Sequence, residues 1–489
     1  MLFNSHIFML LFLPLLLAGW YFLNWKKKFQ LAQGYLIGMS LWFYAYANLQ
    51  YLWLLLFSCL IGWLLSCLPE KISSEKGKKV LTGVGCVFHL GLLGYFKYSN
   101  FFLENLNTVF HTDFPMLQIL LPVGISFYTF QQLAYLIDRC RGDAPRDSFF
   151  DYLTFMVYFP QLLQGPILLR SEFMGQLKEP ERRRFHAERF SEGIQFFVFG
   201  LAKKVLLADT LAKAVNYGYS NVSMLDSISA LLLAVGYLRE LYFDFSGYCD
   251  MAVGLGKMIG LEVAENFDAP FHSASVKEFW RRWHMTLGRF FTRYVYIPLG
   301  GNRRGKMRTL CNVMIVMLLS GLWHGAAWTF VLWGFLHGVG MIWDNLEHPH
   351  LPKKWMRQAA TFAYVCMTFV FFRAESIAQG VDVLKSIVSL KWNGFVFQMA
   401  SALDMTEFYM ITKALSMKLP GLLSWFWLGI FVVLIAICFR VLSGEKVSGV
   451  VALQRQKGYG RLYPVLLAVL FTWSMISMTG VSEYLYFSF

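Results

Sequence analysis

The chain has 489 residues, of which 57 % are hydrophobic and only 15 % are charged, with a mean hydropathy of +0.47. A soluble protein of this length usually carries about a quarter charged residues, so the composition indicates a membrane protein. The net charge of +14 is explained by basic loops that fix topology, and no nucleic-acid recognition motif occurs. The eight cysteines are scattered without a C-x-x-C pair, which argues against a zinc site or a disulfide framework.

Long apolar runs begin near the N-terminus, and a span needs roughly 20 predominantly apolar residues. Ile7 to Leu23 lacks a preceding basic residue and a cleavage site, so we expect a retained first span rather than a signal peptide. Tyr35 to Leu68 is long enough for a two-helix hairpin. It lies between the basic stretches "NWKKKF" and "PEKISSEKGKK". The positive-inside rule then predicts that both stretches are cytoplasmic and the N-terminus is outside.

No internal repeat and no polar stretch the size of a soluble domain interrupts these runs. We therefore expect one integral-membrane domain over residues 1–489, with about 10 to 12 spanning helices and some re-entrant or interfacial segments. The run Tyr242 to Leu261 contains Asp244, Ser246 and Asp250. Acids inside such a run must be paired or must line a polar pathway. They could orient a histidine or tie helices together.

The basic segment 277–308 holds seven arginines and two lysines against one acidic residue. A helix from Phe279 to Arg293 would gather its aromatic side chains on one face and its arginines, including Arg281 and Arg282, on the other. Such a helix lies in the membrane interface, here on the cytoplasmic side. His284 falls at the edge of the aromatic stripe and points inward. It is either a functional group or an interfacial histidine without chemistry.

A turn follows in "YIPLGGNRRG", which contains Arg303 and Arg304. The next run, Leu318 to Gly338, is apolar enough to span, yet it contains His324 and His337. Small residues around His324 let other backbones approach. Its expected neighbours include the following residues: Ser320, Trp323 and Trp328. His324 would line a substrate cavity or form a packing hydrogen bond, whereas the helical angle of His337 favours packing.

At these residues the sequence resembles the membrane-bound O-acyltransferase family, in particular its bacterial branch of alginate O-acetyltransferase membrane subunits. The resemblance rests on an ordered series of motifs that extends from the N-terminus to about Ser376. The series comprises "NSHIFMLLFLPLLLAGWY", "LPVGISFYTFQQLAYLIDRCRG", "YFPQLLQGPI", "FVFGLAKKVLLAD", "YFDFSGYCDMAVGLGKMIGL", "KEFWRRWHMTLGRFFTRYVYIPLGGNR", "SGLWHGAAWTFVLWGFLHG" and "FVFFRAES". Residues 377–489 look like less characteristic spanning helices.

This resemblance implies an all-α polytopic membrane fold, with re-entrant and interfacial helices around a central tunnel. His324 matches the conserved histidine of the family, and His284 matches a second position that holds Asn or His in different branches. The implied donor is acetyl-CoA or another acyl-CoA, with no bound cofactor. Its phosphates would suit Arg281, Arg282, Arg303 and Arg304, because guanidinium binds phosphate in a bidentate way; the alternative is that these arginines only set topology.

In this reading His324 is the general base, and His284 orients the thioester, stabilises the oxyanion or relays the proton. The bacterial branch further implies a multi-pass protein of the inner membrane that works with an extracytoplasmic, esterase-like (SGNH-type) acetyltransferase, a polysaccharide acceptor such as alginate, and surrounding lipid. One alternative is D-alanyl transfer for teichoic acid modification from a carrier protein. Another is a proton-coupled transporter or polymer-export channel. A purely structural scaffold has no need for ionisable groups at membrane depth.

Overall fold

The computed structural model describes every residue except 347–351, 441–446, 458–459, 461, 479–483 and 486–489. The described part of the chain is helical and contains no strand, which confirms the all-α fold class. It forms two compact units. The first unit comprises Met1–Val198, Tyr248–Glu265 and Thr286–Pro298, and the second comprises Phe199–Gly247, Asn266–Met285 and Leu299–Phe489. That these units form the single expected domain stays a prediction.

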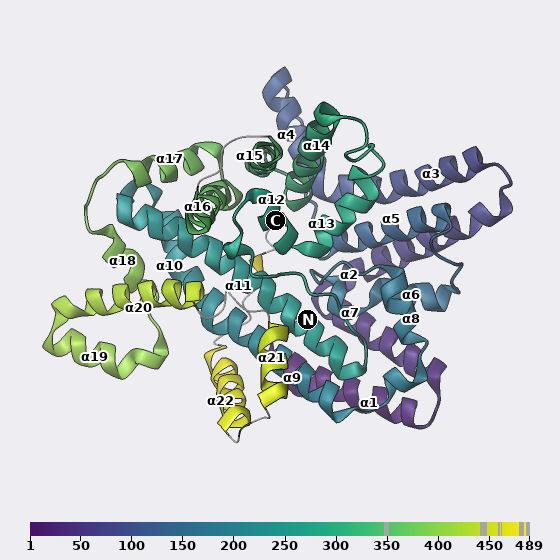
Figure 1. Ribbon diagram of the computed structural model, residues 1–489, viewed down its shortest axis with the longest axis horizontal. Coiled ribbons are helices and arrows are strands. Elements are labelled where there is room, and N and C mark those ends of the chain that lie inside the picture. The colour runs from purple at the N-terminus through teal and green to yellow at the C-terminus, as the bar shows by residue number, and fades with distance from the viewer. Residues whose placement is uncertain (347–351, 441–446, 458–459, 461, 479–483, 486–489) are drawn as a thin grey trace. The chain divides into compact units, whose positions relative to one another are not determined.

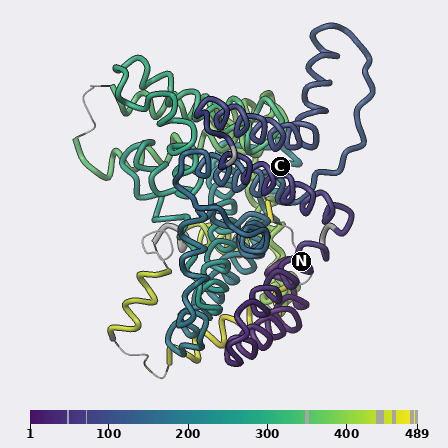
Figure 2. Tube along the Cα trace, turned by 90° about the vertical axis from the view of Figure 1, so that its right-hand side faces the viewer, coloured from purple at the N-terminus to yellow at the C-terminus, as the bar shows by residue number. Residues whose placement is uncertain are grey.

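The first unit is built mainly from the N-terminal helices (Figure 1). Its helices are α1 (Leu13–Trp25), α2 (Phe29–Cys67), α3 (Glu75–Leu93), α4 (Ser99–Phe110), α5 (Ile125–Arg141), α6 (Phe149–Val157), α7 (Phe159–Leu162), α8 (Arg170–Leu177), most of α9 (Ala187–Ala202) and most of α13 (Met285–Phe291). Within it, α2 packs against α1 and α6, and α3 packs against α5. An exposed segment between α4 and α5 forms the long loop seen in Figure 2.

The expected hairpin at Tyr35 to Leu68 is wrong, because α2 is one helix of 39 residues. At 1.5 Å per residue its ends lie about 58 Å apart along the helix axis. The two basic stretches therefore flank one long helix and do not meet at the open end of a hairpin. The length of the apolar block could not reveal this, because the same length suits one long helix or two shorter helices joined by a turn. Glycine and proline are the residues that would indicate such a turn.

Four described helices are long and apolar enough to cross a membrane. They are Phe8–Trp25, Leu49–Glu70, Glu75–Phe110 and Lys306–His324, and Pro420–Ala436 and Leu462–Ser477 are shorter apolar helices. This count is below the expected 10 to 12 because other long helices carry charge. The 33-residue α11 (Ser227–Ile259) has Arg239, Glu240 and Asp244 near its middle.

The second unit holds the middle and C-terminal helices (Figure 1). These are α10 (Asp209–Ser220), the first part of α11, α12 (Val276–Arg282), α14 (Lys306–His324), α15 (Trp328–Asn345), α16 (Lys354–Arg373), α17 (Ile377–Val388), α18 (Phe395–Ser401), α19 (Tyr409–Lys418), α20 (Pro420–Arg440), α21 (Val447–Lys457) and α22 (Leu462–Ser477).

Short π-helical turns occur in the two units at Phe8–Phe12, Gly94–Tyr98, Lys203–Ala208 and Thr292–Tyr296. Short 3-10 turns occur at Leu68–Lys71, Pro180–Arg183, Val222–Met224, Pro270–His272 and Thr406–Phe408.

Helices α14 and α15 meet at glycines, which sets how closely their backbones approach (Figure 1). A Cβ added at Gly321 would lie 2.3 Å from the carbonyl oxygen of Phe330, and one added at Gly334 would lie 2.4 Å from that of Met317. Any larger residue at either position would push the helices apart. The small residues near His324 thus permit close backbone contact, as the sequence suggested.

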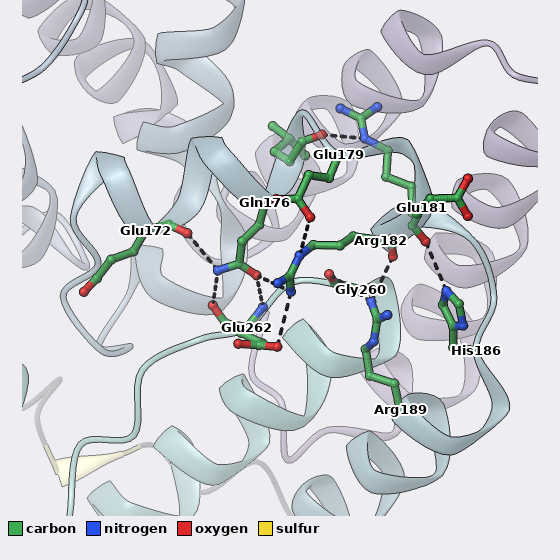
Figure 3. Close-up of polar contacts among 11 residues, drawn as sticks. Glu172, Gln176, Glu179, Glu181, Arg182, His186, Arg189, Gly260 and Glu262 are labelled. Atoms are coloured by element: carbon green, nitrogen blue, oxygen red, sulfur yellow. Dashed lines mark hydrogen bonds and ion pairs between the residues drawn. The ribbon is translucent and has the colours of Figure 1, made fainter.

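The basic loop that begins at Lys178 is held by its own polar contacts within the first unit (Figure 3). The guanidinium of Arg182 donates to Glu179 Oε2 at 2.8 Å, to Glu262 Oε1 at 3.2 Å and to Gln176 Oε1 at 3.3 Å. Gln176 Oε1 also accepts the backbone N–H of Glu262 at 2.7 Å. This network fastens the loop to the segment that follows α11.

Candidate active site

His324 is the last residue of α14, and the chain is extended at Gly325 and at Ala327 before α15 begins at Trp328. The single spanning helix expected from Leu318 to Gly338 is therefore wrong. The aromatic ring of Phe330 occupies the space beside Gly325, where a Cβ would come within 2.1 Å of the ring. His324 thus lies at the end of α14, at a break between two packed helices.

Aromatic rings surround His324, which is 3 % exposed. The centroid of its ring lies 4.9 Å from that of Trp323, 5.2 Å from Trp333 and 5.1 Å from Phe372. Trp323 is itself buried, so it forms part of this wall. Trp328 is 56 % exposed, so it does not enclose the site as Trp323 does.

His284 lies between two short helices, α12 and α13. The continuous helix expected from Phe279 to Arg293 is wrong, because Trp283 is extended and His284 has φ +45°, in the left-handed region. A residue other than glycine held there costs of order 1–3 kcal/mol and persists only where its surroundings enforce it. The break also means that the arginines do not share one helix face.

The two histidines come together in the second unit. Their ring centroids are 6.5 Å apart, and His284 is completely buried. The His284 ring packs edge-on against Phe245 of α11 at 4.7 Å and lies 6.0 Å from Trp323. Its Nδ1 lies 3.2 Å from Oδ1 of Asn266, which is also buried. These contacts bring together segments that are about 40 residues apart in the sequence.

Two further buried polar groups adjoin His324 and have no hydrogen-bond partner among the described residues. Ser320 Oγ lies one helical turn before His324, on the same face of α14. The Nε1–H of Trp333 is the second buried polar group without a partner among the described residues. Trp333 is fully buried, and its ring is in contact with that of His324. Because buried polar groups are nearly always hydrogen-bonded, this arrangement suits a polar ligand that would bond to them.

Burial lowers the pKa of the His284 imidazole to about 3, because the charged ring would be removed from water. His284 is therefore neutral at physiological pH. A neutral imidazole carries one N–H donor and one lone pair, so it can accept a proton from a reacting hydroxyl. Among the described residues no group of three or more His, Cys, Asp or Glu side chains could hold a metal ion.

The four candidate phosphate-binding arginines differ in their surroundings, although all lie in the second unit. Arg282 donates to Glu278 Oε1 at 2.8 Å and to the Asp268 carbonyl at 3.4 Å. Arg281, Arg303 and Arg304 are exposed. Arg303 and Arg304 lie in the loop before α14, which Asn312 anchors by donating to the Gly301 carbonyl at 2.9 Å.

The acids of α11 do not act together. Asp244 is buried and pairs with Lys204 at 2.7 Å, and it also accepts the backbone N–H of Leu485 at 3.1 Å. Lys204 in turn pairs with Asp209 at 2.8 Å. Asp250 is half-buried in the part of α11 that belongs to the first unit. The contacts of Asp244 tie three segments of the chain together and do not involve the histidines.

His337 has a different environment from the two histidines of the site. Trp280 Nε1 donates to its Nδ1 at 3.2 Å, and Thr368 Oγ1 lies 2.9 Å from its Nε2. Both ring nitrogens are therefore engaged by protein side chains. This arrangement is that of a packing histidine.

The sequence pointed to His284 and His324 but not to Asn266, Trp333 or Phe372. Asn266 lies 18 residues before His284 in a segment without regular structure, and no spacing rule connects the two. Trp333 and Phe372 look like any other aromatic residue of an apolar helix. Only the packing of α14, α15 and α16 brings their rings to His324.

The fold and the site define an all-helical membrane protein with two buried histidines at helix breaks. Residues 141–379 match the membrane-bound O-acyltransferase family. The chain is 35 % identical over 423 residues to the peptidoglycan O-acetyltransferase of Helicobacter pylori, covering 80 % of each chain. It is 39 % identical over 389 residues to the probable alginate O-acetylase of Azotobacter vinelandii, covering 77 % of this chain and 76 % of that one.

The teichoic acid D-alanyltransferase of Streptococcus thermophilus is 28 % identical over 253 residues, covering 49 % of this chain and 58 % of that one. The likeness to the two O-acetyltransferases thus extends over more of the chain. The protein belongs to the membrane-bound O-acyltransferase family, and it is an acyltransferase.

Proposed function

We propose that the protein takes an acetyl group from cytosolic acetyl-CoA and passes it across the bacterial inner membrane for O-acetylation of an extracytoplasmic polysaccharide such as alginate. The pairing of His324 with His284, two buried side chains whose ring centroids are 6.5 Å apart, is the observation that carries this proposal. Relatives named for peptidoglycan and alginate O-acetylation support a glycan acceptor. We also propose that the N-terminus is outside, because Lys26 to Lys28 follow the first span.

His324 acts as the general base in this proposal. Its imidazole accepts the proton of the acceptor hydroxyl while the hydroxyl oxygen forms a bond to the thioester carbonyl carbon. The carbon–sulfur bond then breaks, and the departing coenzyme A thiolate takes up the proton that the imidazole accepted, which restores the neutral base. Ser320 Oγ and Trp333 Nε1 are donors suited to the carbonyl oxygen as it gains charge. A positioned general base typically contributes about 10²–10⁴ in rate.

The donor reaches the site by way of the exposed arginines. Arg281, Arg303 and Arg304 are available to bind the phosphates of coenzyme A, whereas Arg282 already pairs with Glu278. On the far side of the membrane an SGNH-type acetyltransferase receives the acetyl group and delivers it to the polymer. This partner accounts for the absence from the sequence of a G-x-S-x-G motif.

D-alanyl transfer is the second candidate, and the D-alanyltransferase of Streptococcus thermophilus gives it its support. It ranks lower because that likeness covers about half of the chain at lower identity. Membership of an acyltransferase family leaves the proton-coupled transporter without comparable support.

The test compares wild type with His324→Ala in membranes that contain the partner, using radiolabelled acetyl-CoA. We expect label incorporation into the glycan to be lost at an unchanged protein level. Unchanged incorporation would show that His324 only packs, and the mechanism given above would then be wrong. If wild type incorporates nothing, carrier-bound D-alanine is the donor to test next.

A further inference from the structure

Asn266 begins a segment that runs beside the turn containing His284. The backbone N–H of Met285 donates to the Asn266 carbonyl at 2.9 Å, and the backbone N–H of Asp268 donates to the Arg282 carbonyl at 2.9 Å. These two bonds bracket His284 on both sides in the sequence. They explain how a histidine with φ +45° is held in place, and they do not depend on the side chain of Asn266.

The side chain of Asn266 makes a separate contact, in which Oδ1 lies 3.2 Å from His284 Nδ1. An amide oxygen only accepts hydrogen bonds, so Nδ1 of the ring must carry the hydrogen. In a neutral imidazole the other nitrogen, Nε2, then holds the lone pair. Burial of His284 keeps the ring neutral, as shown above.

We propose that Asn266 is a positioning residue that fixes the Nδ1–H tautomer of His284, so that His284 Nε2 accepts and relays a proton and does not donate to the oxyanion. This inference rests on the proposed acetyl transfer and deepens it. The sequence was compatible with three roles for His284: orienting the thioester, stabilising the oxyanion or relaying the proton. The inferred tautomer selects the proton relay. Stabilising an oxyanion through Nε2 would require a hydrogen on that atom, which this tautomer lacks.

The elements around His284 fit a relay to His324. Phe245 of α11 contributes an apolar ring, and α14 contributes Trp323 and His324. His324 is thus the titratable group that the described contacts place opposite His284. A proton accepted at one imidazole can pass to the other through the acceptor hydroxyl or a bridging water.

The first experiment measures kcat and the KM for acetyl-CoA of Asn266→Ala and Asn266→Asp in partner-containing membranes. Asn266→Ala keeps both backbone bonds but removes the acceptor that selects the tautomer. We expect kcat to fall about tenfold, the effect of losing one net hydrogen bond in the transition state, with KM nearly unchanged. Asn266→Asp still accepts from Nδ1–H, so we expect it to recover most of kcat at neutral to alkaline pH.

The second readout is the pH dependence of kcat. The carboxylate of Asn266→Asp favours the protonated imidazole and so raises the pKa of His284. The relay needs the neutral ring. As the pH is lowered, Asn266→Asp should therefore lose activity at a higher pH than wild type does, so the acid limb of its pH profile should move to higher pH. A purely structural role predicts equal losses in both variants and no displacement of the acid limb. An unshifted limb in Asn266→Asp would overturn the proposal even if Asn266→Ala failed to accumulate.

Asn24→Ala is the matched control, since Asn24 is a buried asparagine whose side chain donates to the Trp20 carbonyl in α1. It should keep the wild-type kcat and acid limb. Wild-type kcat in Asn266→Ala, alongside active wild type, would disprove the positioning role alone. Absence of transfer by wild type itself would instead count against the proposed function.

Discussion

His324 and His337 lie on consecutive helices, and both pack against the indole of Trp333, at 5.2 Å and 4.8 Å between ring centroids. Both are almost completely buried. Trp280 and Thr368 engage the ring nitrogens of His337. The ring of Trp323 packs against His324, and the hydroxyl of Ser320, one helical turn earlier, has no hydrogen-bond partner among the described residues. Burial alone therefore does not separate His324, which we propose to be catalytic, from the packing histidine His337. The polar groups around each ring are what differ.

The helices that carry these histidines, α14 and α15, also differ at their N-terminal ends. Helix α14 starts directly after the exposed Arg303 and Arg304 and ends at His324, about 27 Å further along its axis. It thus joins a basic surface to the buried site. Helix α15 begins at Trp328 and has His337 in its middle, and its first turn contains no charged residue. The two histidines should therefore respond differently to changes in chemistry and in packing.

The largest expected effect separates the two histidines by activity. His324→Gln should lower kcat for acetyl transfer by about 10²–10⁴, the usual contribution of a general base. His337→Gln should retain most of kcat, because its amide can still bond to Trp280 and Thr368. Both variants are assayed in membranes at matched protein levels. A loss of activity in His337→Gln as severe as in His324→Gln would break the comparison.

An intermediate effect is expected at the basic start of α14. The double variant Arg303→Ala with Arg304→Ala should raise the KM for acetyl-CoA about two- to fivefold, because two exposed ion pairs of about 0.2–0.5 kcal/mol each are lost. Its kcat should stay unchanged, and the difference from wild type should shrink at high salt. Lys385→Ala, an exposed charge on α17, is the control. An unchanged KM would restrict these arginines to a topological role.

The smallest effect is one of stability. Thr368→Val leaves Nε2 of the buried His337 without its partner and should destabilise the protein by about 1–2 kcal/mol, with kcat preserved. Thermal unfolding in detergent measures this as a lowered midpoint. Ser320→Ala is the matched control: its hydroxyl has no partner among the described residues, so its removal should not lower the midpoint. Equal midpoints for wild type and Thr368→Val would show that His337 is not held as described.

The sequence by itself determined the class of the protein and the residues of greatest interest. Long apolar runs indicate a membrane because a helix of about 20 apolar residues spans the hydrocarbon core and satisfies its backbone hydrogen bonds internally. Histidine within an apolar run is costly enough to need a cavity or a partner, and the motif series around His284 and His324 resembled one family. The small residues before and after His324 also predicted close backbone contact, and Gly321 provides it.

Only the tertiary structure decided where the helices break. Periodicity describes a helix that continues, so it could not foresee the left-handed turn at His284, which backbone hydrogen bonds to Asn266 and Asp268 hold in place. The same limit applies to α2, a single helix where a hairpin was expected. Asp244 could not be assigned a role until Lys204, 40 residues away, was found beside it. Contacts between segments that are distant in the sequence hold the turn at His284 and form the ion pair of Asp244, and local sequence patterns do not contain them.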